Sequence, residues 1–158
     1  MPTPRNTRCR VPRDDYRRRG RECAFANMKL MARALGSLYD EILRPCGLTA
    51  SELALVWAIV ALEPTPLSGV AAATLTDATT LSRTVMRLCD AGLCTLLLGD
   101  DKRTRIVATT ALGRRRLRAA MPYWERAQTL VATLVPLDAV ERLARHLRRS
   151  RRAVAAAV

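Results

Sequence analysis

Residues 67–118 constrain the fold most strongly, because the spacing of apolar residues changes there from helical to strand-like and back. Leu81, Val85 and Leu88 recur at steps of four and three, which predicts one inward face of a helix that Asp77 or Thr79 caps. A shorter helix precedes it, from Ser68 as its cap to about Leu75. Residues 93–98 and 105–109 predict the two strands of a hairpin, and a long helix follows.

A helix pair followed by a hairpin and another helix is the layout of a winged helix-turn-helix. In that layout the second helix faces a DNA groove and the hairpin, or wing, faces the neighbouring backbone. Hydroxyl groups contact phosphates or base edges, and arginine can bind guanine in a bidentate manner. A basic wing tip suits a minor groove, and we expect Asp101 to pair with Arg103 and stiffen it. The predicted DNA-binding residues are Ser68, Thr79, Thr80, Ser82, Arg83, Arg87, Asp101, Lys102, Arg103 and Arg105.

The rest of the chain predicts helices around this lobe. A first helix over about 22–44 carries a heptad-like apolar seam, and Thr49 with Glu52 forms a capping box before a nearly all-apolar helix that ends at about Leu62. A helix over about 111–135 contains Pro122, which should kink it, and a last helix follows Pro136. The predicted stripe that 111–135 buries is Leu117, Met121, Trp124 and Val131.

The predicted fold class is therefore mainly α with a small β-hairpin wing: a winged helix-turn-helix lobe on a helical dimerisation base, with about six helices. We expect a disordered basic arm over residues 1–21, a single domain over 22–152 and a short tail over 153–158. Within the domain, 63–110 form the lobe, and 22–62 and 111–152 form the base.

The net charge of +13 is concentrated at the two ends of the chain. Residues 1–22 hold eight Arg against three acids, residues 113–158 hold eleven Arg against three acids, and the segment between them is neutral. This excess suits an anionic partner such as nucleic acid, although Arg-rich solvated helix faces can also follow from a coding bias. No nucleophile, nucleotide or metal motif occurs, and His146 is the single histidine, so we expect no enzyme, no cofactor and no metal site.

Five cysteines show no paired spacing, which predicts free thiols in a reducing, cytoplasmic compartment. No apolar stretch is long enough to span a membrane, so no membrane partner is expected. Cys23 lies near the start of the first helix and follows several arginines, a setting that is typical of reactive thiols. The alternative is that Cys23 is buried or unreactive.

Several segments together resemble the MarR (multiple antibiotic resistance regulator) family of winged-helix repressors. The resemblance covers about residues 22–150. The segments that carry it are Leu38-Tyr39-Asp40-Glu41, Arg44-Pro45-Cys46-Gly47-Leu48-Thr49, Asp77-Ala78-Thr79-Thr80-Leu81-Ser82-Arg83, Ala91-Gly92-Leu93, Asp101-Lys102-Arg103-Thr104-Arg105 and Thr109-Thr110-Ala111-Leu112-Gly113-Arg114.

This resemblance implies a homodimer that binds double-stranded DNA at a pseudo-palindromic operator. It also implies release by a small aromatic or lipophilic effector between base and lobe, where Tyr39 and Trp57 would lie. Two alternatives remain open: a thiol-based redox-sensing repressor that uses Cys23, and a non-enzymatic interaction module with weak DNA specificity. The chain departs from the family where Thr74-Leu75-Thr76 replaces a common Leu-Gly-Leu turn and where Ala78 replaces a common Arg.

Overall fold

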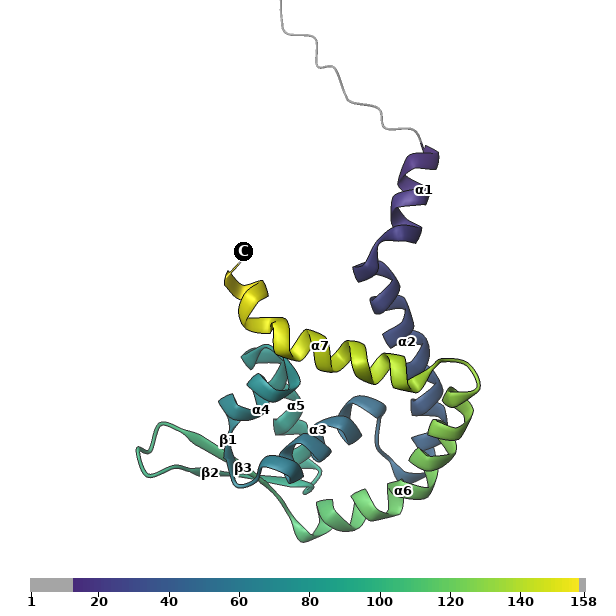
Figure 1. Cartoon of the computed structure of the whole chain (residues 1–158). Helices are drawn as coiled ribbons and strands as arrows, with labels where there is room; N and C mark the ends of the chain where they lie inside the picture. Colours follow the sequence, from purple (N-terminus) through teal and green to yellow (C-terminus); the bar gives the residue numbers. More distant parts are fainter. Residues whose placement is uncertain (1–12, 157–158) are drawn as a thin grey trace, which may run out of the picture. The chain divides into compact units, whose positions relative to one another are not determined.

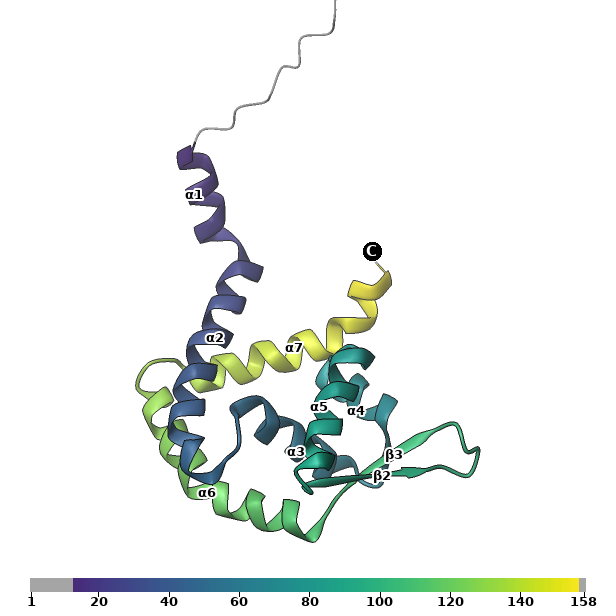
Figure 2. The same ribbon diagram turned by 180° about the vertical axis from the view of Figure 1, so that it is seen from behind.

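The computed structural model describes residues 13–156, and their side chains as far as Ser150. Contacts divide the chain into two compact units, Met1–Leu35 and Gly36–Val158, and each unit is described by itself. The described residues are mainly helical with one small sheet, which confirms the predicted fold class (Figures 1 and 2). The elements are α1 (Arg13–Glu22), α2 (Ala24–Leu43), the 3-10 helix η1 (Arg44–Cys46), α3 (Ala50–Leu62), β1 (Thr65–Pro66), α4 (Leu67–Thr74), α5 (Ala78–Asp90), β2 (Cys94–Leu98), β3 (Arg105–Thr109), α6 (Ala111–Ala132) and α7 (Leu137–Ala156).

Helix α1 corrects the expectation of a disordered arm over residues 1–21 for the part that the structure describes. No residue of α1 is buried, so packing does not hold it. Asp15 pairs instead with Arg18 at 2.6 Å and with Arg19 at 2.8 Å, and opposite charges three and four residues apart stabilise an exposed helix. The sequence prediction gave weight to proline, glycine and arginine content and not to this charge spacing. The first part of the predicted arm, residues 1–12, lies outside the described residues.

The core of the second unit is built around α3, which is apolar on nearly every side. Its capping box forms as predicted: the Glu52 amide donates to Thr49 Oγ1 at 3.2 Å, and the Thr49 amide donates to Glu52 Oε2 at 3.0 Å. Helix α3 then buries Leu53, Val56 and Ile59. Burial on most sides fixes α3 as the helix on which the other elements pack.

The sheet is antiparallel with strand order β1-β3-β2. Its β2–β3 hairpin matches the predicted wing, with Leu96 opposite Val107. Strand β1 was not predicted, because Pro64-Thr65-Pro66 reads as a helix stop and two residues are too few to show strand alternation. Thr65 pairs with Val107 in a position at the sheet edge, where a neighbouring proline is tolerated.

Two helix predictions need correction. Helix α4 begins at Leu67 with Pro66 in the cap position and no side-chain cap bond, so Ser68 is not its cap. Helix α6 buries Ala120, Ala127 and Val131, so the predicted stripe is fully buried only at Val131. Leu117 and Trp124 of that stripe are half-buried against the core, and Met121 is partly exposed. Small residues allow this helix to approach the core closely. It continues through Pro122, and Figure 1 shows that it changes direction along its length.

Among the described residues, no single helix combines the length and apolar character needed to cross a bilayer. Two consecutive helical segments separated by a bend, Ala24–Cys46 and Ala50–Leu62, reach that length and apolar character only when they are taken together.

Candidate nucleic-acid interface

Helix α5 has one buried face and one exposed polar face. Asp77 caps it by accepting from the Thr80 amide at 2.8 Å, and hydrogen bonds from Thr80 lower the pKa of Asp77. Leu81, Val85 and Leu88 are at most 1% exposed, which confirms the predicted inward face. The remaining face is exposed and carries Thr79, Thr80, Ser82, Arg83 and Arg87.

Arg83 and Arg87 keep their charges available. Within the described part of the chain, neither of them pairs with an acid, whereas arginines of α1, α6 and α7 do. The two lie one helical turn apart on the exposed face of α5. This face can therefore offer two cations and three hydroxyls to a ligand.

The turn before α5 is built without a glycine. Helix α4 ends at Leu75, whose φ of 55° and ψ of 29° place it in the left-handed region. The Thr76 amide donates to the Ala71 carbonyl at 3.2 Å and closes the turn. Ser68 on α4 is exposed.

Asp101 organises the wing tip, but through backbone amides and a hydroxyl. Its Oδ1 accepts from the Arg103 amide at 3.0 Å and the Thr104 amide at 2.7 Å, and its Oδ2 accepts from Thr104 Oγ1 at 2.6 Å. These bonds, with the Thr104 hydroxyl first, lower the pKa of Asp101. The expected side-chain pairing with Arg103 is wrong, because Asp101 bonds the backbone amide of Arg103 and not its guanidinium. Lys102, Arg103 and Arg105 thus remain exposed at the wing.

The base of the wing holds a cluster that the sequence prediction missed, formed by Glu63, Thr109 and Arg114. Glu63 Oε2 accepts from the Thr109 amide at 2.6 Å and from the Thr109 hydroxyl, and its Oε1 pairs with Arg114 at 2.5 Å. The Glu63 side chain is only 9% exposed. Burial would raise its pKa, but the bonds from Thr109 and the charge of Arg114 bring that pKa below the ordinary value. An acid at the end of an otherwise apolar helix was the one sequence signal for this cluster.

Tyr39 and Trp57, the predicted effector residues, are half-buried against the core. The Tyr39 hydroxyl donates to Gln128 Oε1, and burial raises the pKa of Tyr39. The Trp57 ring meets the Trp124 ring edge to face, with centroids 5.3 Å apart. Both side chains are thus already engaged by α6.

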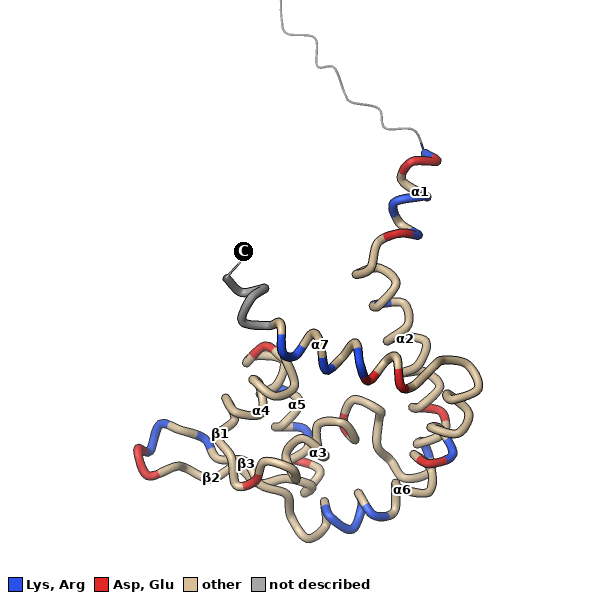
Figure 3. The backbone as a smooth tube through the Cα atoms, in the orientation of Figure 1, with Lys and Arg blue, Asp and Glu red and all other residues tan. Residues whose placement is uncertain are grey.

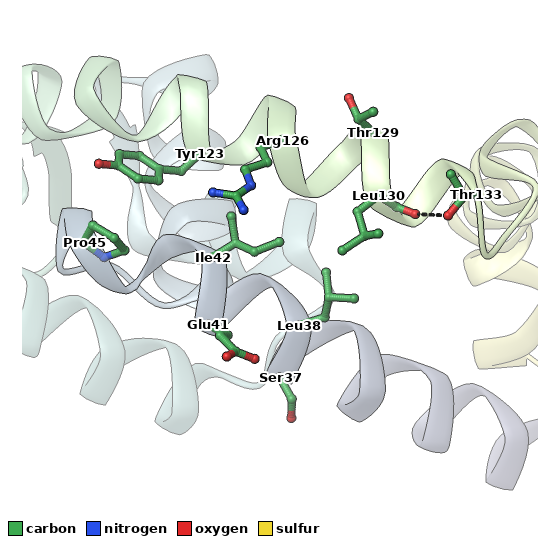
Figure 4. Close-up of a pocket in the computed structure, with 10 residues that line it drawn as sticks. All are labelled: Ser37, Leu38, Glu41, Ile42, Pro45, Tyr123, Arg126, Thr129, Leu130 and Thr133. Carbon is green, nitrogen blue, oxygen red and sulfur yellow. Dashed lines mark hydrogen bonds between the residues drawn. The ribbon is translucent and has the colours of Figure 1, made fainter.

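An open groove of about 1060 Å³ lies between α2 and α6, and it does not include Tyr39 or Trp57 in its walls (Figure 4). Its centre is apolar, and Glu41 and Arg126 add charge to its walls. The lining residues are Ser37, Leu38, Glu41, Ile42, Pro45, Tyr123, Arg126, Thr129, Leu130 and Thr133.

The cysteines differ in exposure. Cys23 is exposed just before α2, and its carbonyl accepts from the Asn27 amide at 3.0 Å. Arg17, Arg18 and Arg19, which precede Cys23, pair with acids of α1. Cys94 is buried, and burial raises its pKa to about 12. All four described cysteines are free thiols, and the described residues contain no His, Cys, Asp and Glu cluster suited to a metal ion.

Basic residues also line α6 and α7. Figure 3 shows blue segments at the start of α6, along α7 and on the wing. Arg116 donates to the Cys46 carbonyl at 3.3 Å, whereas Arg115 and Arg118 are exposed. The positive charge of the second unit therefore lies on α6 and α7 as well as on the wing.

A helix with an exposed polar face, α5, followed by a basic hairpin is the arrangement of a winged helix-turn-helix protein. Comparison of the sequence with known family models and with curated proteins gave no match. Among solved structures, the chain is similar to MosR, a transcriptional regulator of M. tuberculosis crystallised with DNA, at 31% identity and a TM-score of 0.73 over 84% of this chain and 98% of MosR. The chain belongs to the MarR family of winged-helix transcriptional regulators.

More distant structures share the fold. MarR of E. coli is 19% identical, with a TM-score of 0.62 over 80% of this chain and 96% of MarR. CouR of Rhodococcus jostii RHA1, crystallised with p-coumaroyl-CoA, is 20% identical, with a TM-score of 0.66 over 81% of this chain and 91% of CouR.

Proposed function

We propose that this chain is a dimeric, sequence-specific DNA-binding regulator that represses transcription. The exposed face of α5 carries the proposal, because its two unpaired arginines and its hydroxyls stand over a fully buried apolar face. The DNA complex of MosR, the relative at 31% identity, supports the same role.

In this proposal α5 enters a major groove and the wing follows the backbone into a minor groove. Arg83 and Arg87 bind base edges, while Thr79, Thr80 and Ser82 contact phosphates or bases. Ser68 contacts a phosphate from α4. The wing contributes Lys102, Arg103 and Arg105, which Asp101 holds in place from within the tip.

The dimer follows from apolar surface that the second unit leaves uncovered. Leu130 and Leu134 near the end of α6 are 44% and 64% exposed, and Leu143 and Leu147 on α7 are 40% and 51% exposed. We propose that a second copy covers these residues and fills the groove between α2 and α6, because exposed Leu130 is itself part of the groove wall. A two-fold dimer then reads a pseudo-palindrome with half-sites about one helical turn, roughly 10 bp, apart.

Binding to DNA selected from a random library tests this function. Arg83→Ala and Arg87→Ala should each cost about 1–3 kcal/mol of binding free energy and relax the preference at particular base pairs. Arg118→Ala, which removes an equal charge from α6, is the matched control. An equal loss of affinity on every sequence would show that Arg83 and Arg87 bind phosphates only. If no sequence is selected from the library, the proposed function is wrong.

The competing candidate is an interaction module that coats DNA without strong preference. The zero net charge of residues 23–112 favours the interaction module, because this segment contains α5, the helix proposed to bind DNA bases. Affinities for the selected site and for random DNA at one salt concentration separate the two functions. A specific regulator is expected to prefer its site by about 10³-fold or more, and an interaction module is not.

We propose a small aromatic or lipophilic effector as the signal for release, with Tyr39 and Trp57 beside its site. The half-buried aromatic side chains of α2, α3 and α6 support this choice. If an effector lowers the affinity of the protein for operator DNA, operator DNA must lower its affinity for the effector by the same factor.

Thiol oxidation is the alternative signal for release, and the exposure of Cys23 favours it. If peroxide releases DNA, Cys23→Ser abolishes that release and aromatic ligands have no effect, the thiol is the sensor.

A further inference from the structure

Glu63 lies where three elements meet. It is the residue that follows α3, and its backbone amide donates to the Ile59 carbonyl at 2.8 Å. Its carboxylate reaches Thr109, the last residue of β3, and Arg114, in the first turn of α6. One side chain therefore connects the end of α3, the base of the wing and the start of α6.

The carboxylate takes the place of a strand partner. The β1–β3 register pairs Thr65 with Val107 and Pro66 with Ile106, so its continuation places Glu63 opposite Thr109. Backbone pairing of β1 covers only Thr65 and Pro66, and the side chain of Glu63 supplies the acceptor for the next free amide on β3. This bond extends the attachment of the wing beyond the two-residue strand.

The other side of the wing base is held separately. The Thr110 hydroxyl donates to the Gly92 carbonyl at 2.6 Å, and a Cβ at Gly113 would come within 2.1 Å of the Leu93 carbonyl oxygen. These contacts join α6 to the segment that leads into β2. Polar contacts thus hold the base of the hairpin on both sides, in addition to its buried residues Cys94 and Val107, and Glu63 forms the contacts on the β3 side.

We propose that Glu63 is a positioning residue that fixes the direction of the wing relative to α5 and so sets how strongly the wing tip contacts DNA. The inference rests on the proposed DNA-binding function. It assigns no DNA contact to Glu63 itself, which is nearly buried. Its effect reaches DNA through Arg103 and Lys102 at the tip.

A double-mutant cycle on the selected operator tests the proposal. Glu63→Gln keeps an acceptor for Thr109 but loses the charge that pairs with Arg114, and it should weaken operator binding about tenfold. Arg103→Ala should then cost much less in the Glu63→Gln protein than in the parent, because a misdirected tip has less contact to lose. Arg83→Ala should cost the same in both, since α5 is held by its own buried face. Full additivity of Glu63→Gln with Arg103→Ala would overturn the proposal.

Amide hydrogen exchange without DNA separates this inference from the proposed function. In Glu63→Gln the amides of β2 and β3 should exchange faster by a clearly larger factor than those of α5, whose exchange should rise only as far as the loss of global stability requires. Uniformly faster exchange in wing and α5 would mark Glu63 as a stability residue only and overturn the proposal, as would unchanged exchange at the wing. If the parent protein itself selects no operator, the proposed function fails, whatever the exchange pattern.

Discussion

Leu75 adopts a backbone conformation that suits glycine better than leucine. Its φ is 55°, and its side chain is 50% exposed, so little packing offsets the cost. A left-handed residue with a Cβ costs roughly 1–2 kcal/mol, part of which glycine gives back through the entropy of the unfolded chain.

Leu75→Gly should therefore raise the free energy of unfolding by about 0.5–1 kcal/mol, measured by denaturant titration. Ala73→Gly, at an exposed position inside α4, is the matched control and should lower the free energy of unfolding by a similar amount. A lower stability in Leu75→Gly would mean that the leucine side chain contributes packing that its exposure does not suggest.

Glu63 should make the free energy of unfolding depend on pH in the acid range. Its pKa in the folded protein lies below the ordinary value of about 4.3, so its stabilisation is fully present above that pH and is lost as pH falls through the folded pKa. Glu63→Gln should lower the free energy of unfolding by about 1–2 kcal/mol at pH 7 and flatten its decline between neutral pH and the acid transition.

Some acid dependence should survive in Glu63→Gln, because the pKa values of Asp77 and Asp101 are lowered as well. Glu125→Gln, which changes an exposed acid on α6, is the control and should follow the parent curve. Denaturant titrations at a series of pH values supply the measurement, and parallel curves for the parent and Glu63→Gln would contradict the prediction.

At the scale of elements, the sequence predicts those helices and strands that are determined by a residue pattern within a single element. The inward face of α5 and the hairpin strands follow from apolar spacing within one element, and both are found where expected. The bond of Glu63 to Thr109 joins residues 46 apart in the sequence, and strand β1 likewise pairs with a strand far along the chain. No local pattern encodes such contacts. Helix α1 was missed for a different reason, because its stabilisation comes from charge spacing and not from apolar periodicity.

The wing tip offers a test at the same scale. Asp101 accepts three hydrogen bonds inside the tip, whereas the neighbouring exposed Asp100 accepts none among the described residues. Asp101→Ala should loosen the tip and weaken operator binding several-fold, although it removes a negative charge that would otherwise repel phosphate. Asp100→Ala is the matched control, and removing the same charge there should leave affinity equal or slightly higher. Anisotropy titrations at one salt concentration measure both, and equal behaviour of the two variants would contradict the role of Asp101.

At the scale of the whole molecule, charged residues and exposed apolar residues occur together on α7. Helix α7 pairs Arg142 with Asp138 at 2.5 Å and Arg145 with Glu141 on its polar side. Its apolar residues Val140, Leu143 and Leu147 remain 39–51% exposed in the single chain. An amphipathic helix with an uncovered apolar side gains stability when a partner covers it.

We therefore predict an obligate homodimer, with a mass in light scattering of about twice the 17.5 kDa of the chain at micromolar concentration. Leu143→Glu and Leu147→Glu should dissociate it, because each would place a charge in a dry interface. Leu98→Glu is the matched control: Leu98 is 68% exposed on the wing, outside the proposed interface, and its variant should stay dimeric. A dissociated variant binds two half-sites as separate molecules, so its operator binding should need far higher protein concentration. If the parent protein is a monomer and still binds the full operator tightly, the predicted dimer is wrong. The predicted pseudo-palindromic site is then wrong as well, because it depends on two-fold symmetry.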